Sequence, residues 1–511
     1  MRGECKFVVW LFSMWQSGHL NPTLLLGTAL ARSRLDVCVR IVGAEEQEHR
    51  FPPRDAPLGK IAFQPGYTLP PEFATEEQER KFWEKVIDIY ETPKGMDMFA
   101  NQREQFFEHD FTVFGQMLDS ASQKPDLVVV DFASTGIAEA VAHRGLKLAL
   151  STTAPISMGG LCGTLDPPSW LPVPSRLDFP EASKMSFRDR LANVYARYAA
   201  RSDNDRRAAG VDRMRAKYGL PPRPRGAVAD FVPGEPLILA SAFFPLEPPR
   251  ALPPNVVLVG PYAATTAVDP ALASSAQSLF DQLRTNTSNP FVYVAMGSVA
   301  SVSAEQVKGV IATAAAMPDV NFLWSLRPGA GKQHLSDLGL QIPGNVVVSE
   351  WAPQTAILQR RPPPLAFVSH CGGSSSGESL AAGVPLLCDG FGYDQPVIAK
   401  RIEQLGAGMV VKLKNATQLT AALRQVAESR SAFAEAAAVL GRAAARAGGS
   451  DRAAELLGEL LEDRSDGRLL SFASEAKGLR WWQLEFETLL TVCVFGFMLV
   501  LSLSLAAYCW Q

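Results

Sequence analysis

Short apolar runs alternate with longer amphipathic stretches along most of this chain. Apolar runs of strand length, separated by helical patterns, are typical of βαβ units and parallel sheets. Because 511 residues exceed what one hydrophobic core normally holds, we predict an α/β protein with two parallel-sheet domains. The candidate strands are residues 7–12, 37–42, 127–131, 291–295, 322–326, 346–350, 365–369 and 384–388.

Helical patterns and proline-rich passages divide the chain further. A helix is predicted over Pro22–Arg32, with Asn21 as its N-cap and Pro22 at its first position. A basic helical insertion is expected over residues 188–217, and residues 51–111, rich in proline and aromatics, are expected to cover a binding cleft. The expected divisions are an N-terminal domain over residues 1–250, a linker over 251–268, a C-terminal domain over 269–465, a polar linker over 466–485 and an apolar anchor over 486–511.

The last segment has the pattern of a membrane span. No charged residue lies between Thr488 and Trp510, a stretch of 23 residues. At ~1.5 Å per residue this length crosses a hydrocarbon core of ~30 Å, whereas a buried helix of a soluble domain, the alternative, would normally keep a polar face. Lys477 and Arg480 precede the span. The positive-inside tendency therefore predicts a single-pass C-terminal anchor with both domains in the cytosol. The endoplasmic reticulum is the expected membrane.

The N-terminus and the cysteines agree with a cytosolic location. The apolar run at residues 6–12 is short and no small-residue cleavage site follows it, so we interpret it as a strand and not as a signal peptide. The seven cysteines lack a C-x-x-C pair, which predicts a reduced compartment with neither a disulfide scaffold nor a zinc site. Glycans at the sequons of Asn286 or Asn415 would establish the alternative, a lumenal catalytic part.

Charge and motifs exclude several function classes. The net charge is −3 and no basic tract occurs, which argues against nucleic acid as a partner. Gly331-Lys332 lacks the upstream glycine of a P-loop, and Gln333 replaces its Ser or Thr. Asp203-x-Asp205 resembles a metal-binding D-x-D motif but lies in an arginine-rich helical stretch instead of after a strand, so no metal site is predicted.

Polar and aromatic residues follow the predicted strands of the second half. Ligands bind at the carboxyl ends of strands in open parallel sheets, so these residues should face one rim. His370 begins a turn with two glycines and three serines that lead into a helix. Such a helix start offers N–H groups and hydroxyls to an anion, and a plain serine-capped helix is the alternative. With Trp351 to stack on a base, Glu378 to bind a ribose diol and Asp394-Gln395 to bind sugar hydroxyls, a nucleotide-sugar site is predicted.

Two polar residues follow strands of the first half. His19 comes after the first strand and before the predicted helix, and Asp131 ends the strand at 127–131. Neighbouring strands of one sheet would bring them together. A histidine at a helix N-terminus is pushed towards its neutral form, fit to accept a proton, and an aspartate would fix its tautomer and stabilise the imidazolium. A structural histidine is the alternative at this position.

Taken together, these residues resemble the donor-binding signature of family 1 UDP-glycosyltransferases. Gly18-His19-x-Asn21-Pro22 resembles the catalytic histidine motif of that family, and residues 292–298 resemble the strand that opens its donor domain. The resemblance covers most of residues 5–462. The residues that match the donor signature are Trp351, Ala352, Pro353, Gln354, His370, Gly372, Ser375, Glu378, Gly383, Val384, Pro385, Asp394 and Gln395.

The resemblance implies a GT-B fold, in which two Rossmann-like domains face a cleft, and an inverting transfer from a UDP-sugar without a metal or other cofactor. His19 would deprotonate the acceptor hydroxyl, and Asp131 would orient His19. In the donor site, Trp351 and Ala352 would bind uracil, Glu378 the ribose, Ser298, His370 and Ser375 the diphosphate, and Asp394 and Gln395 the sugar. Gln354, Gly372 and Ser374 would also be part of the site.

Two positions depart from the family pattern. Ser374 stands where the family usually has Asn, and Gly373 where many members have a larger residue, which weakens the expected donor contacts. From the family resemblance and the C-terminal span, we expect a membrane-tethered enzyme. It would move a hexosyl group, with glucose favoured by Gln395, to a hydroxyl of a small lipophilic acceptor. A UDP-sugar epimerase on the same scaffold and a catalytically silent UDP-sugar-binding membrane protein are the alternatives.

Overall fold

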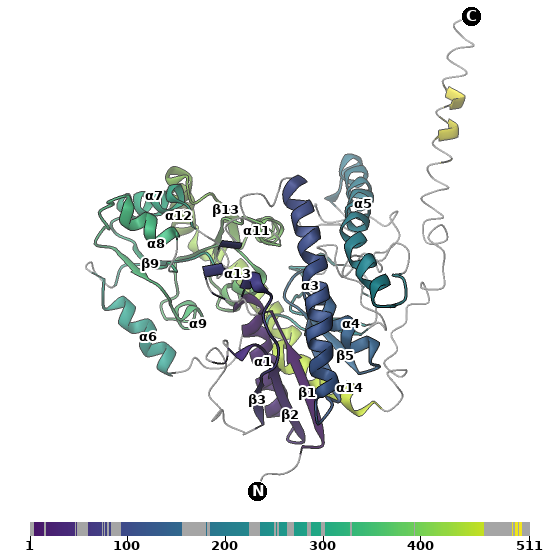
Figure 1. Cartoon of the computed structure of the whole chain (residues 1–511). Coiled ribbons are helices and arrows are strands. Elements are labelled where there is room, and N and C mark those ends of the chain that lie inside the picture. The colour runs from purple at the N-terminus through teal and green to yellow at the C-terminus, as the bar shows by residue number, and fades with distance from the viewer. Residues whose placement is uncertain are drawn as a thin grey trace, which may run out of the picture.

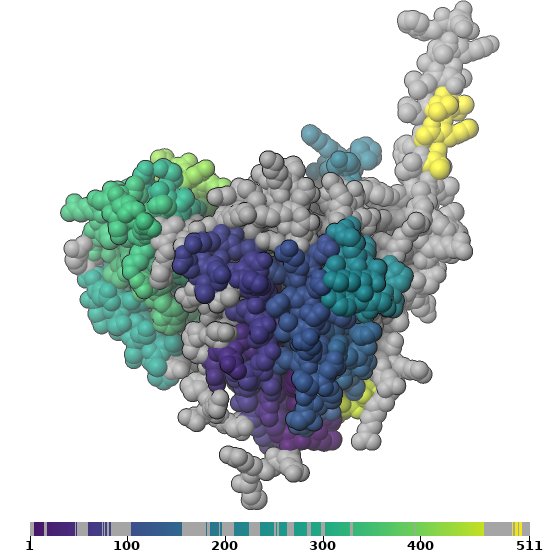
Figure 2. Space-filling model, viewed as in Figure 1, coloured from purple at the N-terminus to yellow at the C-terminus, as the bar shows by residue number. Residues whose placement is uncertain are grey.

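The computed structural model describes residues 5–463 with gaps, the longest at 49–59, 83–92, 156–179, 224–235 and 263–269, together with residues 493, 496–498 and 500–502. The described chain forms two domains, each built on a parallel sheet (Figure 1). In the space-filling view the residues of the two halves form adjoining lobes (Figure 2). The α/β prediction with two parallel sheets is confirmed.

The first sheet has seven parallel strands in the order β3-β2-β1-β4-β5-β6-β7. Its strands are β1 (Phe7–Phe12), β2 (Val37–Val42), β3 (Ile61–Gln64), β4 (Leu127–Asp131), β5 (Leu148–Thr152), β6 (Leu237–Ala240) and β7 (Val256–Leu258). The central strands β1 and β4 are apolar except for Asp131 at the end of β4, because helices cover both faces of the sheet. The helices of this half are α1 (Ser17–Ser33), α3 (Pro93–Ser120), α4 (Thr135–His143) and α5 (Phe187–Lys217).

The second sheet has six parallel strands in the order β10-β9-β8-β11-β12-β13. Its strands are β8 (Phe291–Ala295), β9 (Asn321–Ser325), β10 (Val346–Ser349), β11 (Ala366–Ser369), β12 (Leu386–Cys388) and β13 (Gly408–Val410). The order reverses between β8 and β11, which is where open sheets bind ligands. The helices are α6 (Pro270–Phe280), α7 (Ala304–Ala315), α8 (Ala330–Asp337), α9 (Gln354–Leu358), α10 (Gly373–Ala381), α11 (Gln395–Gln404), α12 (Ala416–Glu428) and α13 (Arg430–Ala447).

The chain crosses between the domains twice. Strand β7 lies within the expected linker 251–268 but pairs with β6 in the first sheet. After α13, the helix α14 (Gly449–Glu462) returns to the first domain and packs against α1 (Figure 1). Its residues Ala453, Leu457 and Leu461 are buried in the same apolar cluster as Leu26. The last helix of the expected C-terminal domain therefore completes the core of the N-terminal one.

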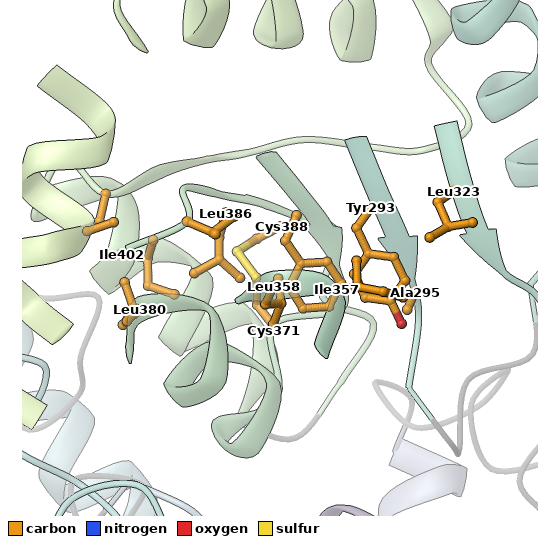
Figure 3. Close-up of a cluster of buried hydrophobic side chains, with 14 of the residues drawn as sticks. Tyr293, Ala295, Leu323, Ile357, Leu358, Cys371, Leu380, Leu386, Cys388 and Ile402 are labelled. Atoms are coloured by element: carbon orange, nitrogen blue, oxygen red, sulfur yellow. A yellow bond between two sulfur atoms is a disulfide. The ribbon is translucent and has the colours of Figure 1, made fainter. Parts of the chain in front are cut away.

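Two disulfides correct the expectation of an all-reduced chain. Cys5 is bonded to Cys38 and Cys371 to Cys388. Each pair is separated by many residues in sequence, but neighbouring parallel strands bring its members together: β1 lies beside β2 and β11 beside β12. The second disulfide lies in the apolar core under the β11–α10 turn (Figure 3). Strand order, which the cysteine spacing does not reveal, decided these pairings.

Among the described residues, none of the helices is both long enough and apolar enough to cross a membrane. Most of the predicted anchor, residues 486–511, lies outside the described residues. The few residues described there are helical, and Phe497, Met498 and Val500 among them are exposed. The anchor stays a prediction.

Candidate active site

The turn that carries His19 belongs to the first helix. We expected a helix from Pro22 with Asn21 as its cap, but α1 begins at Ser17 and contains Pro22. His19 therefore lies in the first turn of α1 at the carboxyl end of β1, where its side chain is partly exposed to the cleft. The hydroxyl of Thr23 donates to the His19 carbonyl at 3.1 Å, which supports this turn from within the helix.

His19 and Asp131 form the predicted pair. Strand β4 lies beside β1, and this order places Nδ1 of His19 2.8 Å from Oδ2 of Asp131. The other carboxylate oxygen, Oδ1, accepts the backbone N–H of Ala133 at 2.9 Å. Phe132 stacks on the imidazole ring. Because one ring nitrogen faces the carboxylate, the proton stays on Nδ1 and Nε2 is left to accept a proton.

Electrostatics favour the protonated form of His19. Burial lowers its pKa, but the charge and hydrogen bond of Asp131, followed by the charge of Asp394, outweigh burial and leave the pKa above its usual 6.5. The net shift is opposite to the one that a helix N-terminus alone predicts. The pair is thus suited to hold the proton that His19 would take from an acceptor.

The turn after β11 has the expected form of an anion site. Cys371 adopts a left-handed conformation with φ of 60°, Gly372 is the N-cap, and α10 begins at Gly373. The amides of Ser374 and Ser375, in the first turn, have no carbonyl acceptor within the helix. Together with the helix dipole they can bind a diphosphate.

His370 lies beside these amides. Burial lowers its pKa to about 4, so the ring is neutral at physiological pH. The Ser369 hydroxyl accepts the Cys371 N–H at 3.1 Å and lies 3.3 Å from His370 Nδ1. With the hydroxyl proton directed to Nδ1, Nε2 carries the ring proton and can donate it to an anion. A Cβ on Gly297 or Gly372 would come within 2.8 Å of the ring, so only glycine fits at either position.

The residues predicted to bind a nucleoside gather at the same rim. Trp351, which follows β10, is 57% exposed, so the indole is open to a ligand. Gln354 at the start of α9 donates from Nε2 to the Ser375 hydroxyl at 3.2 Å and to Glu378 at 2.9 Å. Burial raises the pKa of Glu378, against the hydrogen bonds from Gln354 and Thr355. Ala352, also predicted to bind uracil, is buried.

Asp394 is partly exposed and Gln395 is buried. Asp394 caps α11 and accepts the Gly373 N–H, and burial raises its pKa to about 6 against that bond and the charge of His19. Gln395 is buried, and its amide oxygen accepts the N–H of Phe391 at 3.2 Å. Asp394 therefore lies between the anion site and His19, whereas Gln395 shapes the loop behind it.

Three other site predictions have distinct outcomes. The Ser374 hydroxyl donates to the carbonyl of Gly18 in the first domain at 3.0 Å, although a contact with the UDP-sugar was expected. Ser298 lies outside the described residues. Asp203 and Asp205 lie within α5, and in the described parts of the chain no three His, Cys, Asp or Glu side chains group to hold a metal ion.

Sequence reasoning missed two groups at the cleft. Phe132 forms one wall of the His19 site, and the Thr153 carbonyl meets Gly373 across the domain boundary. Each follows a strand, β4 and β5, so the rule that strand ends carry the site could have found both.

Comparison with known proteins identifies the family of this chain. A family model described as UDP-glucoronosyl and UDP-glucosyl transferase matches residues 72–442. A flavonol 3-O-glucosyltransferase from Arabidopsis thaliana is 30% identical over 151 residues, which cover 28% of this chain and 32% of that protein. An anthocyanidin 3-O-glucosyltransferase from Fragaria ananassa is 36% identical over 28% of this chain and 30% of its own length. The chain thus spans about a third of the length of these curated relatives.

Solved structures share the fold. A glycosyltransferase of kitacinnamycin matches with a TM-score of 0.60 at 18% identity, over 89% of this chain and 99% of its own. The calicheamicin glycosyltransferase matches with a TM-score of 0.57 at 17% identity, over 90% and 99%. These likenesses establish the expected GT-B architecture.

Proposed function

The chain belongs to the UDP-glucoronosyl and UDP-glucosyl transferase family, and from this premise we propose that it transfers a hexosyl group from a UDP-sugar to a hydroxyl of a small acceptor. The observation that carries the proposal is the position of the His19–Asp131 pair opposite the α10 helix start. Asp394, which touches α10, lies close enough to His19 to raise its pKa. A base and an anion site meet at one cleft.

The proposed reaction uses both sides of that cleft. Nε2 of His19 accepts the proton of the acceptor hydroxyl while the oxygen attacks the anomeric carbon from the face opposite UDP, which inverts the configuration. UDP leaves with its charge held by the α10 amides and the neutral His370. We propose that this arrangement needs no divalent metal, so that activity should survive EDTA.

Replacement of His19 by alanine tests the mechanism. The variant should lower kcat by roughly 10²–10⁴ while UDP still binds, because the base contributes to the chemical step and not to donor affinity. The assay measures UDP release with UDP-glucose and a panel of flavonols, sterols and hydroxy lipids. Unchanged turnover in H19A would refute the role of His19.

The same assay identifies the substrates. Relatives named for flavonol and anthocyanidin glucosylation support glucose as the sugar and a lipophilic phenol as the acceptor. The product should be a β-glycoside, which its anomeric proton coupling would reveal. Conversion of UDP-glucose to another UDP-sugar without an acceptor would instead indicate an epimerase, and UDP-sugar binding with neither product would indicate a silent binding protein.

A membrane location is a separate proposal. We propose that residues 486–511 anchor the chain in the endoplasmic reticulum membrane with both domains in the cytosol. The uncharged segment from Thr488 to Trp510 supports a membrane span, and Lys477 and Arg480 before it support the orientation. Protease protection of sealed vesicles tests the orientation, because cytosolic domains are digested without detergent. Glycan occupancy at Asn286 or Asn415 would overturn it.

A further inference from the structure

One carbonyl in the His19 turn lacks its usual partner within the helix. Gly18 lies in the first turn of α1, and the residue four positions later is Pro22. Proline has no N–H, so the helical hydrogen bond from residue 22 to the Gly18 carbonyl cannot form. This carbonyl therefore needs a donor from elsewhere.

The donor comes from the other domain. The Ser374 hydroxyl donates to the Gly18 carbonyl at 3.0 Å across 356 positions of sequence. Ser374 is the second residue of α10, whose start is the proposed diphosphate site. One hydrogen bond thus joins the turn that carries the base to the helix that would hold the leaving group.

Neighbouring glycines let the domains approach at this point. A Cβ on Gly373 would lie 2.2 Å from the Thr153 carbonyl of the first domain, so no other residue fits while the domains hold this position. One turn further along α10, a Cβ on Gly377 would lie 2.8 Å from Pro261. The face of α10 is shaped for close backbone contact, and Ser374 lies within that contact.

Asp394 extends the connection to the catalytic base. It accepts the Gly373 N–H, and its charge contributes to the raised pKa of His19. His19 therefore interacts with one carboxylate from each domain, Asp131 and Asp394. The distance between His19 and Asp394 depends on how closely the His19 turn and α10 approach each other.

We propose that Ser374 is a positioning residue, whose hydroxyl binds the carbonyl that Pro22 leaves free and so holds the His19 turn against the donor helix. The kinetic consequence rests on the proposed transferase function, whereas the contact itself does not. Ser374 keeps its backbone amide in the first turn of α10, so the side chain bridges the domains while the amide still faces the anion site.

Three variants of the full chain test the kinetic consequence. In S374A, kcat with UDP-glucose and the best acceptor of the panel should fall about 3- to 10-fold, the effect of one net hydrogen bond, with the KM for UDP-glucose unchanged. S374T keeps a hydroxyl and should retain most of the activity. S336A, which removes an exposed hydroxyl of α8 that donates within its own helix, should match the unmodified chain. A wild-type kcat in S374A, or a loss confined to KM, would overturn the proposal.

Pro22 supplies a second, more specific test. P22A provides the missing N–H, so the Gly18 carbonyl gains a partner inside α1. In that background S374A should cost less than about 2-fold, a non-additivity expected only if both residues act through this carbonyl. Equal losses in the two backgrounds would refute the connection.

Hydrogen exchange separates this inference from the proposed function. With UDP present, the peptide covering residues 17–26 should exchange faster in S374A than in the unmodified chain or in S336A. Unchanged exchange would show that the contact does not hold the His19 turn, whatever the enzyme does. If the panel yields no transfer but exchange responds as expected, the transferase proposal fails and the contact stands.

Discussion

Replacing Asp131 by asparagine should disable His19 without removing any atom from the cleft. Asp131 accepts two hydrogen bonds: Oδ1 from the Ala133 N–H at 2.9 Å, and Oδ2 facing His19 Nδ1 at 2.8 Å. In D131N the amide oxygen should take the Ala133 position, because only an oxygen can accept that bond. The introduced NH₂ group then faces Nδ1 and donates to it, which moves the ring proton to Nε2.

The size of the effect follows from this tautomer change. With the proton on Nε2, the ring nitrogen that faces the acceptor can no longer take a proton. D131N should therefore lower kcat by roughly 10²–10⁴, the usual contribution of a general base. Donor affinity should be unchanged, since Asp131 is nearly fully buried and lies on the acceptor side of the cleft. Isothermal titration with UDP and initial rates with a saturating acceptor measure the two quantities.

The pH dependence of the residual activity gives an independent check. In the unmodified chain the pKa of His19 is raised, so kcat/KM should fall as the pH drops below that value and the base becomes protonated. Without the charge of Asp131, burial dominates and the pKa of His19 should fall, which moves the acidic limb of the profile to lower pH. A limb that stays in place, or a loss of kcat under tenfold, would refute the proposed pairing.

Two further predictions concern the donor site and the first domain. Replacing Trp351 by alanine should weaken UDP binding by about 1–3 kcal/mol, the typical contribution of stacking on a base. W351F should retain most of the affinity. Equal losses of affinity in both variants, measured by calorimetry, would argue against stacking. Burial raises the pKa of Asp110 to about 7, against the hydrogen bond from Tyr67. The folded state therefore holds this proton up to higher pH than the unfolded chain, and the stability so gained is complete below about pH 4 and lost as the pH rises to about 7. Thermal melts between pH 4 and 8 should show a shallower decline in D110N than in the unmodified chain, and parallel curves would contradict the assignment.

Much of the donor site could be predicted from sequence because it consists of local segments. Each segment follows a strand, and parallel strands end at the same edge of a sheet. The turn from His370 to Ser375 and the exposed Trp351 therefore lie where their positions after β11 and β10 predict. His19 and Asp131 likewise meet because β1 and β4 are neighbours, an arrangement that sequence pattern could propose but not prove.

Other features depended on contacts between distant segments. Helix α14 has an amphipathic pattern that indicates a helix but not its partner, and only packing places it on α1. The two disulfides follow from strand order, which 33- and 17-residue separations do not encode. The direction of the His19 pKa shift required the distances to Asp131 and Asp394.

The His19 turn separates most directly what the sequence determines from what the tertiary structure determines. The sequence by itself determined that residue 22, a proline, has no N–H to donate, which holds in every fold. The structure showed that α1 begins at Ser17, so that Gly18 is the helical residue whose carbonyl this missing N–H leaves free. Only the tertiary structure decided what replaces that N–H, namely the Ser374 hydroxyl from the opposite domain. The missing N–H is a covalent property of proline and is visible in the sequence. The partner across the cleft, Ser374, depends on how the two domains pack against each other.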